Sequence, residues 1–160
     1  MIVAFLESVK YVGHFIPIAI LRIYLGYYFF DLAYEHYTGD FLTQPHLAAM
    51  INEWLPTSPA PDWYMYFLEN VVVPSWRFFA YLLTYLEFVI GLSLILGFLV
   101  RPMALLGFLV CLNYLYISSP DVANLYRLCM AVMITLSWLG AGRCLGIDYF
   151  FFKRQRGIWW

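Results

Sequence analysis

The sequence has few charged residues for its length. Only 12% of its 160 residues are Asp, Glu, Lys or Arg, about half of the roughly 25% that is typical of soluble proteins. Nine basic and ten acidic residues nearly cancel, so the chain lacks the basic surface that nucleic-acid binding requires. The low charge content excludes an ordinary soluble domain, and the lack of excess basic residues excludes a nucleic-acid partner.

The sequence also lacks the common motifs of cofactor and metal sites. It has no GxGxxG or GxxxxGK[ST] loop, no HExxH and no CxxC. His14, His36 and His46 lie at or beyond the ends of the first apolar segment, so a haem held by two histidines of this chain is not expected. We expect no metal site, no covalently bound cofactor and, given the early Glu7, no cleavable signal peptide.

What the sequence does contain is apolar and aromatic residues, at 64% and 21% of the chain. A membrane-spanning helix needs about 20 largely apolar residues, and four segments qualify or nearly do: 15–37, 74–100, 102–117 and 122–139. The pattern predicts an all-α integral membrane protein, a four-transmembrane-helix bundle that forms a single domain over residues 1–160.

The segment 38–73, between the first two spans, has a different pattern. Its first half has apolar residues at helical spacing, which predicts an amphipathic helix at the membrane interface: Leu47, Met50, Ile51, Trp54 and Leu55. Prolines then break the chain, and an aromatic-rich helix follows. We expect an ordered helical cap on the outer face. Whether the cap binds a ligand or only covers the bundle is left open.

The distribution of Lys and Arg predicts the orientation. Segment 38–73 has no Lys or Arg and carries four acids. Placing both termini in the cytoplasm puts most basic residues on the inner side: Lys10, Arg101, Arg143, Lys153, Arg154 and Arg156. The positive-inside rule therefore predicts a multi-pass protein of the inner (cytoplasmic) membrane with cytoplasmic N- and C-termini.

Polar residues at one depth within the spans form the candidate site. At 1.5 Å per helical residue, Glu87, Asn113 and Arg127 each lie ~18 Å from the inner ends of their helices. Arg22 lies lower, at ~10 Å, but has a long side chain. We expect Glu87 to face the bundle interior, paired with Arg127 or Arg22 and bridged by Asn113, because unpaired charges rarely face lipid.

Two readings of this layer stay open: a polar pocket for a head group, proton or anion, and a purely structural ion-pair clasp. Asp31 and Glu35 lie above it on the first span and would extend it outward. Cys111 and Cys129 lie at similar depths on the third and fourth spans, so a contact between them is possible. We expect them to serve as small apolar residues of the core rather than in a redox role. No catalytic residue is assigned.

Three stretches of the sequence resemble the DoxX/DoxD family. They are "LRIYLGYYFF" in the first span, "YLEFVIGLSLILGFLVRPMALLG" around Glu87, and "GAGRCLGID" after the last span. The resemblance covers most of the chain and implies the four-span fold. The long outer segment is more similar to the DoxD branch, which includes the membrane subunit of thiosulfate:quinone oxidoreductase.

The resemblance implies a DoxD-like membrane subunit of a quinone-linked electron-transfer complex, with oxidation of a sulfur compound as one version. A quinone or a lipid would then be the bound small molecule, and Glu87 would accept a proton. The partners would be the lipid bilayer and other membrane or peripheral subunits. The alternatives are a non-catalytic accessory subunit of a larger energy-converting complex and a small-molecule carrier, so the sequence does not decide whether the protein is an enzyme.

Overall fold

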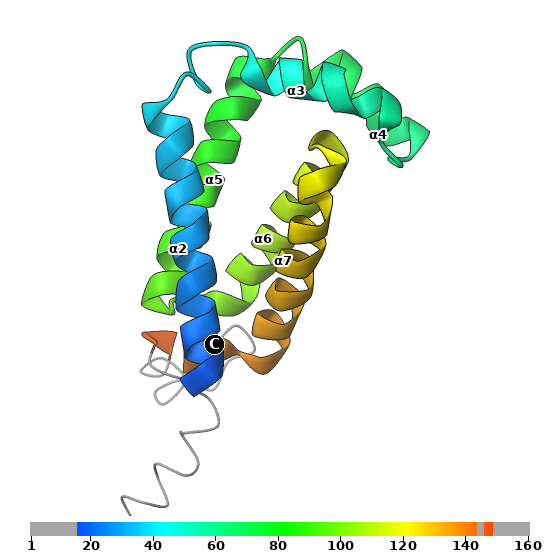
Figure 1. Ribbon diagram of the computed structural model, residues 1–160. Helices are drawn as coiled ribbons and strands as arrows, with labels where there is room; N and C mark the ends of the chain where they lie inside the picture. The colour runs from blue at the N-terminus through cyan, green and yellow to red at the C-terminus, as the bar shows by residue number, and fades with distance from the viewer. Residues whose placement is uncertain (1–15, 144–145, 149–160) are drawn as a thin grey trace, which may run out of the picture.

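The computed structural model describes residues 16–143 and 146–148, a helical bundle beneath a helical cap (Figure 1). Four described helices are long and apolar enough to cross a membrane, and no described residue is in a β-strand. They are α2 (Ile16–Thr38), α5 (Trp76–Leu96), α6 (Val100–Ile117) and α7 (Pro120–Leu139). The predicted all-α, four-span architecture is confirmed.

Three predicted spans agree with these helices to within two residues at each end. The second span ends earlier than predicted, at Leu96 rather than at residue 100. Gly97 closes α5 with a φ of +68°, in the left-handed region, and its N–H bonds the carbonyl of Ser93. A glycine adopts this conformation without the steric cost of a Cβ atom, so the turn into α6 falls at residues 97–99.

The predicted cap is ordered and lies across one end of the bundle (Figure 1). It consists of α3 (His46–Trp54), the 3₁₀ turn η1 (Leu55–Thr57), α4 (Asp62–Phe67) and the π-helical turn η2 (Leu68–Val72). Leu47, Ile51 and Leu55 bury their side chains, as the amphipathic pattern predicted. We call this end of the bundle the cap end, and the opposite end, where α5 turns into α6, the base.

Helices α2 and α5 pack antiparallel through two glycines. A Cβ atom on Gly91 would lie 2.7 Å from the backbone N of Phe30, and one on Gly26 would lie 2.9 Å from the backbone N of Ile95. Small residues permit this close backbone approach, which is a common basis of helix association in membranes. The contact fixes the vertical register of α2 against α5. Helices α6 and α7 form the second pair (Figure 1).

The Gly-Ala-Gly-Arg stretch and the Asp148 that follows it close the base. The buried Asp148 carboxylate accepts hydrogen bonds from the backbone N–H groups of Leu99, at 2.7 Å, and Val100, at 3.1 Å. These groups begin α6, where unsatisfied N–H groups and the helix dipole favour an anion. Arg22 donates to the carbonyl of Ala141 at 2.8 Å. The motif therefore ties the turn after α7 to both α2 and the α5–α6 turn.

Candidate functional site

Glu87 is fully buried in the middle of α5 and accepts two hydrogen bonds. The Tyr114 hydroxyl of α6 lies 2.5 Å from Oε1, and Nδ1 of His36 on α2 lies 2.8 Å from Oε2. Both carboxylate oxygens therefore have a hydrogen-bond partner, and these bonds offset part of the free-energy cost of burying an acid in a membrane span. The prediction that Glu87 faces the bundle interior is confirmed.

The glycine contact explains why His36 meets Glu87. Phe30 of α2 lies beside Gly91 of α5. The two helices are antiparallel, so residue numbers rise toward the cap on α2 and fall toward the cap on α5. One turn above Gly91 on α5 is Glu87. Above Phe30 on α2 come Ala33 and then His36. The His36 ring stacks on Phe41 at a centroid distance of 4.0 Å. Phe41, just beyond α2, thereby holds the imidazole toward the acid.

A layer of aromatic and thiol side chains continues from Tyr114 into α7. The Tyr114 ring stacks on Tyr126 at 5.2 Å with 13° between the ring planes. Tyr126 in turn interacts with Tyr28 of α2. Cys111 and Cys129, one turn toward the base, are buried free thiols that interact with each other. The contact that their similar depths made possible is therefore present.

The predicted pairing of Glu87 with Arg127 is wrong. Arg127 is exposed on α7, and its Nη1 donates to Asn124 Oδ1 at 2.9 Å. Asn113 is half-buried and forms no bridge to Glu87. The neighbouring residues Tyr114 and Tyr126 do lie in the Glu87 layer. The facing direction was wrong, since each step along an α-helix turns the side chain by about 100°.

The alternative pairing of Glu87 with Arg22 is also wrong, because the two side chains lie at different levels of the bundle. Arg22 is fully buried near Gly97 at the base, and Gly97 lies ten residues along α5 from Glu87, or ~15 Å. Its guanidinium holds the turn after α7 through Ala141. Arg22 is therefore a structural residue of the base and not part of the Glu87 layer.

Asp31 and Glu35 do not extend this site. Both side chains are exposed on the outward face of α2, whereas the buried residues of α2 include Phe29 and Ala33. The predicted outward extension is wrong. His36, which lies near the end of its span and was not among the predicted site residues, is the residue of α2 that reaches Glu87.

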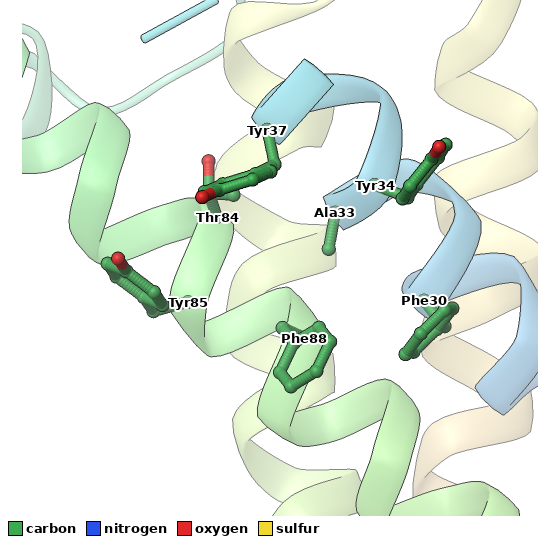
Figure 2. A pocket seen from close by; sticks show the side chains of 7 residues that line it. All are labelled: Phe30, Ala33, Tyr34, Tyr37, Thr84, Tyr85 and Phe88. Atoms are coloured by element: carbon green, nitrogen blue, oxygen red, sulfur yellow. The ribbon is translucent and has the colours of Figure 1, made fainter.

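An open groove lies between α2 and α5 beside the Glu87 layer (Figure 2). Its volume is about 290 Å³. Ala33 and Thr84 are its buried members, each three residues before a member of the His36–Glu87 pair. Exposed or half-buried rings form its walls: Phe30, Tyr34, Tyr37, Tyr85 and Phe88. Figure 2 shows Tyr37 of α2 reaching across toward Thr84 of α5.

Comparison with known protein families identifies the family to which this chain belongs. The DoxX family model matches residues 18–118, which include three of the four spans and the cap. The chain belongs to the DoxX family. No curated protein and no solved structure gives a significant match. This DoxX protein is therefore a multi-pass membrane protein in contact with the lipid bilayer, from a family often linked to quinone-related oxidoreduction.

The described residues also limit the chemistry of the site. Among them, no group of three or more His, Cys, Asp or Glu side chains is placed to hold a metal ion. The groups at the Glu87 layer are a carboxyl, an imidazole and phenol hydroxyls. These groups bind, donate and accept protons, so the arrangement is suited to proton handling beside a membrane groove.

Proposed function

We propose that this DoxX protein is a membrane subunit that binds a quinone in the α2–α5 groove and handles its protons through Glu87 and His36. The main support for this proposal is the buried Tyr114–Glu87–His36 network, which lies next to a groove that opens on the outside of the bundle. One version of this proposal is a DoxD-like subunit of a complex that oxidises a sulfur compound.

The groove fits a single substituted ring. Its volume of about 290 Å³ is at the lower end of small-molecule sites, which hold roughly 300–1,000 Å³. Aromatic rings line its walls, and the hydroxyls of Tyr34, Tyr37 and Tyr85 can donate hydrogen bonds to ring oxygens. An opening on the surface of two spans would leave an apolar tail in lipid. A quinone bound there would supply two-electron, two-proton redox chemistry.

The chain's own residues would supply and remove protons. Glu87 and His36 share one hydrogen bond of 2.8 Å, so a proton on either group is stabilised by the other. Tyr114 keeps the second carboxylate oxygen satisfied whichever form is present. Electrons would come from a partner subunit, because the sequence has no haem, iron–sulfur or flavin motif.

A photoreactive quinone tests this proposal on the purified protein in lipid nanodiscs. We expect labelling to map to α2 and α5 at the groove. Ala33→Leu, which fills the buried part of the groove, should reduce labelling, and Leu82→Ala on the exposed surface of α5 should not. Glu87→Gln should leave labelling intact while slowing quinone reduction by the native complex.

Equal labelling of the wild type and Ala33→Leu would refute the groove as the site. An absence of saturable labelling in the native complex would favour an accessory role.

A further inference from the structure

Beyond the first turn of each described span, three charged side chains face outward, unlike Glu87. Asp31 and Glu35 are exposed on α2, and Arg127 is exposed on α7. Within the described part of the chain, neither acid has an ion-pair partner, and the Arg127 guanidinium bonds only the neutral Asn124. Two acids and one base therefore lie unpaired on the outside of a membrane bundle.

A chain of side-chain contacts connects the level of Glu35 on α2 with that of Arg127 on α7. Glu35 precedes His36, which bonds Glu87; Glu87 bonds Tyr114, and Tyr114 stacks on Tyr126, the neighbour of Arg127. This layer lies ~20 Å from the base, counted along α7, within a hydrocarbon core about 30 Å thick. Asp31 lies ~6 Å nearer the base.

Lipid alone does not satisfy these three groups. A charged side chain facing the centre of a bilayer costs at least ~2.5–3.5 kcal/mol, and such residues normally face a protein interior or pair with each other. A lipid phosphate could neutralise Arg127, but an anionic phosphate would repel Asp31 and Glu35. A protein surface that carries both signs at this height satisfies all three.

We propose that this protein assembles head-to-tail with copies of itself, so that α7 of one copy packs against α2 of the next. Copies inserted in the same orientation have the same depth, so Arg127 of one copy meets Glu35 of its neighbour, with Asp31 one turn away. The contacting surfaces differ, which makes the interface heterologous and able to close into a ring. Assembly of this kind does not require a bound quinone.

The outward face of α7 fits a helix–helix contact. Of the four spans, α7 has the smallest buried share within the chain. Ala131 and Thr135, one and two turns from Arg127 on the same face, are exposed and small, which favours close helix packing. The Thr135 hydroxyl already donates to the Ala131 carbonyl at 2.8 Å, so covering this face leaves that hydroxyl satisfied.

Charge reversal with complementation tests the interface. One variant carries Asp31→Lys with Glu35→Lys, and the other carries Arg127→Glu. Each variant alone places like charges together and should weaken association by more than about tenfold. Co-expressed with different tags, the two variants should co-purify, because each junction then joins opposite charges. Oligomer size is read by native mass spectrometry from nanodiscs.

Two sets of controls separate this result from misfolding. Glu53→Lys and Arg77→Glu reverse exposed charges outside the proposed interface and should leave the oligomer intact. The neutral variants, Asp31→Asn with Glu35→Gln and Arg127→Gln, should each weaken assembly. Co-expressed, they should form only pairs, because one junction regains the native charges and the other joins two neutral surfaces.

A wild-type protein that is monomeric in the bilayer would overturn the proposal. If the monomer then carries bound anionic lipid that the Arg127→Glu variant lacks, Arg127 is part of a lipid site instead. Oligomers that persist in both charge-reversal variants would overturn the pairing.

Discussion

Tyr114→Phe removes one hydroxyl from the Glu87 network and keeps the ring that stacks on Tyr126. Hydrogen bonds to charged groups contribute about 1.5–3 kcal/mol in soluble proteins, and measured values within membrane bundles are lower, at about 1–2 kcal/mol or less. We therefore expect a loss of ~1–2 kcal/mol in the free energy of unfolding. Glu87 would keep only the His36 hydrogen bond, while the packing of the layer would change little.

A double-mutant cycle with Glu87→Gln shows whether this loss belongs to the Tyr114–Glu87 contact. The Gln side chain still accepts a hydrogen bond, but charge-assisted bonds are about twice as strong as neutral ones. The two substitutions should therefore couple by ~1 kcal/mol. Glu87→Gln and Arg127→Met should instead be additive within about 0.3–0.5 kcal/mol, because these side chains have no shared contact.

The measurement is reversible unfolding in mixed detergent–lipid micelles, followed by helical circular dichroism and by tyrosine absorbance. Arg127→Met serves as the matched control, since it lies at the same depth on an exposed position. Coupling of Glu87 to Arg127 that exceeds its coupling to Tyr114 would refute the geometry of the site. It would restore the ion pair that the sequence predicted.

Three further predictions concern the packing and orientation of the bundle. Gly91→Leu should destabilise the protein by at least ~1–3 kcal/mol, because its Cβ would meet α2 backbone; unchanged thermal stability would refute the close contact. Asp148→Ala should cost ~1–2 kcal/mol by uncapping α6, measured by the same unfolding assay. A cysteine at Ser58 should react with an impermeant thiol reagent added outside the cell and one at Gln155 should not; the reverse pattern would invert the predicted topology. Gln155 lies outside the described residues.

The spans and the cap were predictable because their signals are local. A run of apolar residues long enough to cross a bilayer is visible without knowledge of its neighbours. The amphipathic spacing of Leu47, Ile51 and Leu55 likewise predicted the buried face of α3. The inward position of Glu87 followed from the cost of leaving an acid in lipid, and this argument needs no partner to be named.

The partners of Glu87 were not predictable in the same way, because they depend on rotation and register. In a membrane span both the lipid-facing and the inward-facing residues are apolar, so periodicity gives little information about facing direction. Asn113 and Arg127 were therefore assigned the wrong facing direction. His36 depended on the register of α2 against α5, and the signal for it was the pair of glycines, Gly26 and Gly91, that sets the contact.

The register of α2 also connects the two proposals. This helix places His36 inward at the acid, Glu35 outward at the proposed neighbour, and Tyr34 and Tyr37 in the groove wall. These residues occupy little more than one turn, so a contact that moves or holds one of them acts on the others. A neighbouring copy that pairs with Glu35 would therefore stabilise one position of the groove wall and of His36. Any ligand that prefers that position would favour assembly to the same extent, since the coupling free energy between two binding events is reciprocal.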